Sequence, residues 1–162
     1  MDNFTNRARQ VLGLKHLLVI SNRVIANVAY FSDPKALELY LDGVHYDILL
    51  FAFWSHKVPD FLLKKYKVYG MHTGPLLDGK GKGGSPIDNL KALGVQYTTL
   101  CVFEMTNRID EGKVILAEPL DISDDKSEII CRIDREIPDI EAFLLAREHQ
   151  INIEIPERFK RI

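Results

Sequence analysis

Residues 46–53 read YDILLFAF, and this stretch decides the fold. Apolar side chains fill both faces of it, as in a strand that is covered on both sides of a parallel sheet. Working outward along the chain, predicted strands alternate with predicted helices. The strands are residues 15–21, 24–31, 67–71, 97–104 and 114–120; the helices are residues 3–12, 33–43, 59–65 and 85–94, and one from residue 123 that Pro138 interrupts. This alternation predicts an α/β fold: a single three-layer sandwich with a largely parallel, Rossmann-like sheet.

The bulk composition indicates one small domain with no membrane segment. The chain has 162 residues, a net charge of −2 and a sequence pI near 6.2, which gives no general basic excess for binding nucleic acid. We therefore expect residues 1–162 to form one compact domain without a nucleic-acid partner. No apolar run is long enough to cross a bilayer, and the N-terminal residues lack an apolar signal core. The two cysteines form no CxxC pair, so we expect a cytoplasmic protein without a metal site.

A histidine at the end of a predicted strand is the first candidate for chemistry. His72 follows residues 67–71 and precedes a glycine-rich loop. Imidazole titrates near neutral pH and can serve as general acid or base, although a hydrogen-bonded structural histidine is the slightly more common case. Asp110, in the turn Ile-Asp-Glu-Gly, is its natural partner, because a carboxylate orients an imidazole and stabilises its charge. On spacing alone, an ordinary turn aspartate explains Asp110 better.

Two further segments could bind ligands. Residues 79–84 read GKGKGG and lead into a helix that Ser85 and Pro86 begin. Glycines and a helix N-terminus let backbone N–H groups approach a phosphate or carboxylate, with Lys80 and Lys82 adding charge, but a solvated loop is an equally good interpretation. Phe53, Trp54 and Ser55 end the central strand, where an aromatic ring either stacks on a flat ligand or packs against the protein.

Taken in order, two of these segments resemble folate-dependent formyltransferases. GMHTGPLLDGKGKGGSPIDNL (residues 70–90) and IDEGKVILAEPLDI (residues 109–122) follow the family's order of a histidine, a glycine-rich loop, a Pro-led helix and an Asp-x-Gly turn. FAFWSHKVP (residues 51–59) is similar to the family's strand-end segment. The Gly-Gly-Ser-Pro of residues 83–86 and the Asn-Leu of residues 89–90 are closest to the sugar N-formyltransferase branch. The resemblance therefore implies a formyltransferase-type sheet.

The resemblance also implies a role for each candidate residue. It makes His72 and Asp110 catalytic and names two groups of ligand-binding residues. The donor 10-formyltetrahydrofolate would contact Phe53, Trp54, Ser55, Val58 and Gly112, and the substrate would contact Thr73, Lys80, Lys82 and Ser85. The sequence departs from the family pattern at Gly70, where the family usually has Asn, and at Lys80 or Lys82, where Arg is common. The N-terminal unit is also shorter than is usual for the family.

The implied reaction is transfer of a formyl group from 10-formyltetrahydrofolate to an amine. The branch resemblance favours a small-molecule acceptor, an amino sugar that we expect to be nucleotide-linked, and the edge strands allow a homodimer. Two alternatives stay open. One is a catalytically weak or inactive module that binds a folate or a nucleotide sugar, and the other is a formyl-folate hydrolase that releases formate.

Overall fold

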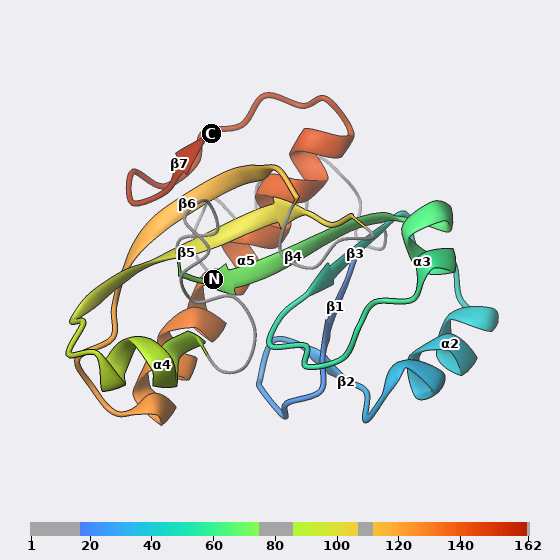
Figure 1. Ribbon diagram of the computed structural model, residues 1–162. Helices are drawn as coiled ribbons and strands as arrows, with labels where there is room; N and C mark the ends of the chain where they lie inside the picture. The colour runs from blue at the N-terminus through green and yellow to red at the C-terminus, as the bar shows by residue number, and fades with distance from the viewer. Residues whose placement is uncertain (1–16, 75–85, 107–111, 162) are drawn as a thin grey trace.

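The computed structural model describes residues 17–74, 86–106 and 112–161, and the predicted helix at residues 3–12 lies outside this part. Within it, seven strands form one sheet in the order β2-β1-β3-β4-β5-β6-β7 (Figure 1). The strands are β1 (Leu17–Ser21), β2 (Ala29–Tyr30), β3 (Ile48–Phe51), β4 (Lys67–Thr73), β5 (Tyr97–Glu104), β6 (Val114–Asp121) and β7 (Lys160–Arg161). The helices are α2 (Pro34–Asp42), α3 (Asp60–Lys65), α4 (Pro86–Ala92) and α5 (Lys126–Glu148).

The sheet confirms the predicted α/β fold class. Strands β2, β1, β3 and β4 pair in parallel, whereas β5, β6 and β7 each pair antiparallel with the strand before them. Because two reversals restore the direction, β6 runs the same way as the parallel strands. Five of the seven strands therefore point in one direction, and their carboxyl ends share one edge of the sheet.

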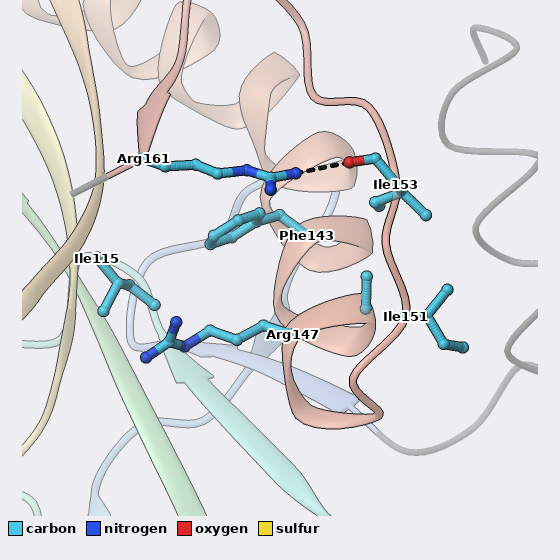
Figure 2. A pocket seen from close by; sticks show the side chains of 7 residues that line it. Ile115, Phe143, Arg147, Ile151, Ile153 and Arg161 are labelled. Atoms are coloured by element: carbon cyan, nitrogen blue, oxygen red, sulfur yellow. Dashed lines mark hydrogen bonds between the residues drawn. The ribbon is translucent and has the colours of Figure 1, made fainter.

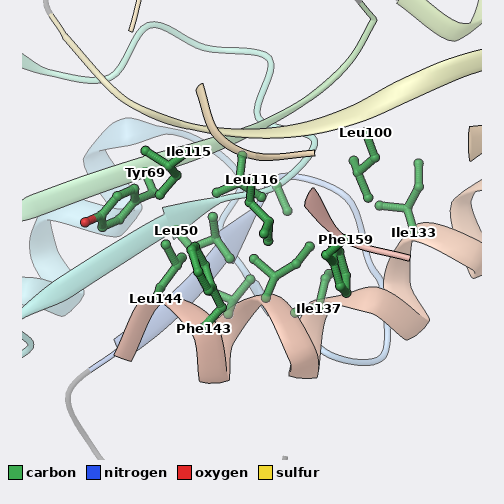
Figure 3. Close-up of a cluster of buried hydrophobic side chains, with 14 of the residues drawn as sticks. Leu50, Tyr69, Leu100, Ile115, Leu116, Ile133, Ile137, Phe143, Leu144 and Phe159 are labelled. Atoms are coloured by element: carbon green, nitrogen blue, oxygen red, sulfur yellow. The ribbon is translucent and has the colours of Figure 1, made fainter. Parts of the chain in front are cut away.

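Helices cover both faces of the sheet, which gives the three predicted layers. Apolar residues of α2 and α3 pack with Leu49, Phe51 and Val68 on one face. On the other face, α5 and α4 pack against the alternate residues of the same strands, such as Leu50 and Tyr69. Figure 3 shows the side of this larger cluster where α5 lies under the sheet. The strict alternation along β3 explains why YDILLFAF is apolar on both faces.

Local signals place α2 as expected. The side chain of Asp33 accepts a hydrogen bond from the backbone N–H of Ala36 at 2.9 Å, Pro34 occupies the first turn, and Gly43 caps the C-terminus. None of the helices in the described ranges is both long and apolar enough to cross a membrane.

Two predicted elements differ from the structure. The strand expected over residues 24–31 is reduced to the two residues of β2. The interruption expected at Pro138 does not occur, because α5 continues without a break from residue 126 to residue 148. Proline lacks an N–H, so the helical carbonyl of Asp134 loses its usual donor. The side-chain amide of Asn27 donates to that carbonyl at 3.1 Å instead, which supplies the missing hydrogen bond.

Candidate functional site

The candidate site lies at the carboxyl edge of the parallel strands. In the register of β3 and β4, Phe51 pairs with Gly70, and both strands continue from this pair toward the same edge. The segment that begins at Phe53 therefore leaves the sheet beside the strand end that carries His72. The carboxyl edge of an open α/β sheet is where such folds bind ligands. The structure thus brings together two of the segments that the sequence singled out.

The segment after β3 has an unusual backbone. Phe53 has a φ of 53°, in the left-handed region that non-glycine residues seldom adopt. Such strain persists where the surroundings fix it, and it is concentrated at functional sites. The next residue, Trp54, packs at 5.3 Å from the Phe51 ring and 5.4 Å from the His56 ring, both edge to face. Its buried Nε1 group donates to no acceptor among the described residues.

The sequence interpretation missed Asn22, which follows β1 directly. Its side-chain carbonyl accepts a hydrogen bond from the backbone N–H of Ser55 at 3.1 Å, and its amide donates to the Ser55 hydroxyl at 2.5 Å. These two bonds join the loops after β1 and β3 and hold the Phe53–Trp54 backbone in place. A polar residue at the carboxyl end of a buried strand was the available signal.

His72 is 8% exposed and lies on the face of β4 that carries Gly70, because side chains alternate along a strand. The residue opposite Gly70 in β5 is Phe103, and the residue opposite His72 is Cys101. The Phe103 ring fills the space over Gly70: a Cβ atom there would lie 2.7 Å from the ring. The same ring lies 3.1 Å from a Cβ placed on Gly112. Phe103 therefore packs between Gly112 and the strand that carries His72.

The Cys101 thiol is a neighbour of His72 that could be mistaken for a nucleophile. Burial raises the pKa of this thiol above its ordinary value, and its Sγ donates a weak hydrogen bond of 3.9 Å to the carbonyl of Gly74. A raised pKa keeps sulfur in the protonated, less reactive form. The Cys101 thiol is therefore a poor candidate for a nucleophile at this edge.

The remaining predicted residues divide into two groups. Val58 and Thr73 are buried, at 6% and 8% exposure, and Val58 belongs to the hydrophobic cluster beneath α2 and α3. The others lie outside the described residues, and their predicted roles stay predictions: Asp110, Lys80, Lys82 and Ser85. Among the residues that the structure describes, no three His, Cys, Asp or Glu side chains are grouped to hold a metal ion.

Solved structures share this arrangement of strands and helices. Methionyl-tRNA formyltransferase from Clostridium thermocellum superposes with a TM-score of 0.67 at 19% identity, over 92% of this chain and 70% of that protein. HypX from Aquifex aeolicus, solved with tetrahydrofolic acid, gives 0.66 at 18% identity, over 88% of this chain and 28% of that protein. A sugar N-formyltransferase from a Shewanella species gives 0.57 at 14% identity, over 88% of this chain and 74% of that protein.

By sequence, no family model and no curated protein matches the chain. The resemblance predicted from the two motif segments is nevertheless confirmed at the level of architecture, because formyltransferases recur among the structural neighbours. The chain has the fold of the folate-dependent formyltransferases.

Proposed function

We propose that this protein transfers a formyl group from 10-formyltetrahydrofolate to the amine of a small molecule. One observation carries the proposal: the formyltransferase fold places His72 and the strained segment at Phe53 on one edge of the sheet. Other proteins with this fold are formyltransferases, and one of the structural neighbours was solved with tetrahydrofolic acid. The acceptor that we propose is a nucleotide-linked amino sugar.

The segment after β3 has chemistry that suits a folate ring. The indole N–H of Trp54 is buried and without an acceptor among the described residues. Leaving a buried donor unpaired costs about 1–3 kcal/mol, so an acceptor atom on a bound pterin would recover that energy. Phe53 and Ser55 are the neighbours of Trp54 in the chain, and Gly112 lies against the Phe103 ring. We propose that these residues, with Val58 behind them, hold the donor.

In this proposal the bound folate supplies the formyl group, and the protein positions it and moves protons. His72 would donate a hydrogen bond to the developing negative charge at the reacting carbonyl, or carry the proton that the amine releases. One preorganised donor of this kind contributes about 3–4 kcal/mol to catalysis. Asp110 would orient the imidazole, while Thr73, Lys80, Lys82 and Ser85 would bind the acceptor.

Calorimetric titration tests the binding part of the proposal. A stable analogue of 10-formyltetrahydrofolate should bind the wild-type protein with a dissociation constant of about 1–10 μM, equivalent to roughly 7–8 kcal/mol. Trp54→Phe removes the N–H but keeps an aromatic ring, so it should weaken binding about tenfold, in line with one lost hydrogen bond. Unchanged affinity in this variant would contradict the proposed role of Trp54. No binding to the wild type would contradict the folate site itself.

Formyl transfer to nucleotide-linked amino sugars tests the catalytic part. His72→Ala should keep folate affinity within about threefold and lower the transfer rate by a factor of about 100 or more. His45→Ala is the matched control, since His45 lies before β3 at the other end of that strand and its side chain is 81% exposed. Equal rates in both variants would exclude His72 from the reaction. Release of free formate in place of a formylated amine would identify a hydrolase.

One observation favours binding without turnover as a second candidate function. The Phe103 ring occupies the space over Gly70, where the resembled family usually carries an Asn side chain. If that side chain is essential for the reaction, this protein would bind a folate or nucleotide sugar and release it unchanged. Normal folate affinity with no transfer to any amino sugar, in wild type and His72→Ala alike, would support this candidate.

A further inference from the structure

A cavity lies on the opposite face of the sheet from His72. It has a volume of about 290 Å³ and is lined by the C-terminal half of α5, by β6, by β7 and by the segment that leads into β7. Figure 2 shows the Phe143 ring between the side chains of Arg161 and Arg147. The lining residues are Ile115, Phe143, Ala146, Arg147, Ile151, Ile153 and Arg161. Ile115 and Phe143 belong to the core cluster on the α5 face, so the cavity is separate from the candidate active site.

The described side chains that line this cavity are apolar except for two guanidinium groups. Arg161 donates one hydrogen bond of 2.6 Å to the carbonyl of Ile153, and its guanidinium lies 5.8 Å from the centre of the Phe143 ring. No carboxylate within the described ranges forms an ion pair with Arg161. A guanidinium has five N–H donors, so four remain for another partner. Arg147 differs, because its guanidinium donates to Glu104 at 3.1 Å.

A neighbouring pocket of about 250 Å³ provides a contrast. Arg147 lines it too, but so do the carboxylates of Glu104 and Glu148. These negative charges would repel an anion from that side. Among the described residues that line the cavity of Figure 2, two are cations and none is acidic. An anion is therefore favoured on the Arg161 side and not in the neighbouring pocket.

We propose that this cavity binds a small organic carboxylate with an aliphatic or aromatic body. The planar fork of Arg161 matches a carboxylate, which would also reduce the repulsion between the two arginines. The isoleucines and Phe143 would cover the apolar body. A volume near 300 Å³ is at the lower end of the range for small-molecule sites, so the ligand is smaller than a nucleotide. Binding would join the C-terminal segment to α5.

The probe for the test is hexanoate, and NMR of the isoleucine methyl groups in the full chain detects its binding. Hexanoate should shift the methyl signals of Ile115, Ile151 and Ile153, with a dissociation constant of about 1 mM, as expected for so few heavy atoms. Hexanamide has the same shape without the charge and should bind at least about tenfold more weakly, because it cannot form the charge-assisted pair.

Arg161→Met should weaken hexanoate binding about tenfold while keeping much of the apolar stem. The control is Arg135→Met, which makes the same charge change at an exposed position on α5 outside the cavity and should leave binding unchanged. The proposal is overturned if hexanoate at about 10 mM shifts none of the three methyl signals. It is also overturned if hexanamide binds as well as hexanoate, or if both arginine variants behave alike.

Discussion

Gly70 and Gly112 are positions where the described fold has no room for a side chain. A Cβ atom on Gly112 would lie 1.4 Å from the backbone oxygen of Glu104, which no adjustment of side chains could relieve. At Gly70 the obstacle is the Phe103 ring, at 2.7 and 2.9 Å. Phe103 is 3% exposed and has little freedom to move. The two glycines therefore allow the Phe103 ring to pack between β4 and the segment that precedes β6.

Gly70→Ala should lower the free energy of unfolding by about 1–3 kcal/mol, the usual cost of overpacking a close-packed core. Urea denaturation measures this loss. Gly43→Ala is the matched control, because a Cβ there meets nothing within 4 Å and the backbone φ of −107° suits alanine. The control should stay within about 0.5 kcal/mol of the wild type.

A double-mutant cycle identifies the cause of that loss. Phe103→Leu shortens the side chain that meets the new methyl group. Gly70→Ala should therefore cost less in the Phe103→Leu background than in the wild type, by about 1 kcal/mol. Equal costs in both backgrounds would mean that another contact, such as the Met105 side chain, and not the Phe103 ring, limits position 70.

The sequence identifies candidate residues better than it identifies their neighbours. His72 and Trp54 can be identified in the sequence because of their residue types and because they lie at the ends of strands. Phe103 does not stand out, because its role depends on the register of β5 against β4, which is set by long-range pairing. Asn22 was missed for the same reason: its partner, Ser55, is 33 residues away in the sequence.

At the scale of elements, the loop between β1 and β2 stabilises the middle of α5. Asn27 makes three contacts of 3.1 Å with Asp134: its backbone N–H and its side-chain amide donate to the carboxylate, and the amide also donates to the carbonyl. That carbonyl is the one left without its helical donor by Pro138. The helix therefore continues through a proline because a distant loop replaces the missing N–H.

Asn27→Ala should lower the free energy of unfolding by about 1–3 kcal/mol, because it removes hydrogen bonds to a partly buried carboxylate and carbonyl. Chemical denaturation followed by circular dichroism measures the loss. The control is Asn152→Ala, which changes an exposed asparagine after α5 and should have little effect.

Pro138→Ala gives this explanation a sharper test. Alanine restores an N–H to the Asp134 carbonyl, so Asn27→Ala should cost less in the Pro138→Ala background, by about 0.5–1 kcal/mol. If Asn27→Ala costs the same in both backgrounds, the amide does not compensate for the proline, and only its bonds to the carboxylate matter.

The sequence predicted the elements whose signals are local. Asp33, Pro34 and Gly43 mark the ends of α2, and the apolar run of residues 46–53 marks β3. The prediction was wrong at β2, where an apolar stretch stays a loop except for the two residues that pair with β1. It was also wrong at Pro138, where the compensating donor is 107 residues distant from the carbonyl that it reaches. Both errors arise from contacts that no local pattern encodes.

At the scale of the whole molecule, the C-terminal segment is held on the sheet by a group of charges. Arg158 forms ion pairs with Glu136 at 2.6 Å, with Glu118 at 3.6 Å, and with Asp139. Glu118 lies on β6, whereas Glu136 and Asp139 lie on α5. One cation thus faces three carboxylates, and two of these are almost fully buried. Because the negative charges outnumber the positive charge, protonation of one of the three carboxylates is favoured.

Glu118 is the carboxyl on which a proton is favoured. Burial and the neighbouring Glu136 raise the pKa of this carboxyl from 4.5 to about 8, against the opposing effect of Arg158. A raised pKa in the folded state means that the folded protein binds the proton more tightly than the unfolded chain does. The resulting stability is fully present below about pH 4.5 and is lost as the pH rises through about 8.

The free energy of unfolding of the wild type should therefore decrease between pH 5 and pH 8 by an amount on the order of 2 kcal/mol. Glu118→Gln should abolish this decrease. Glutamine imitates the protonated acid, so the variant should match the wild type near pH 5 and exceed it at pH 8. Urea denaturation at several pH values measures the difference between the two proteins. Glu157→Gln, an exposed neighbour of Arg158, should leave the pH dependence unchanged. A constant difference between Glu118→Gln and wild type across this range would show that Glu118 is already ionised at pH 5, with Arg158 outweighing the burial.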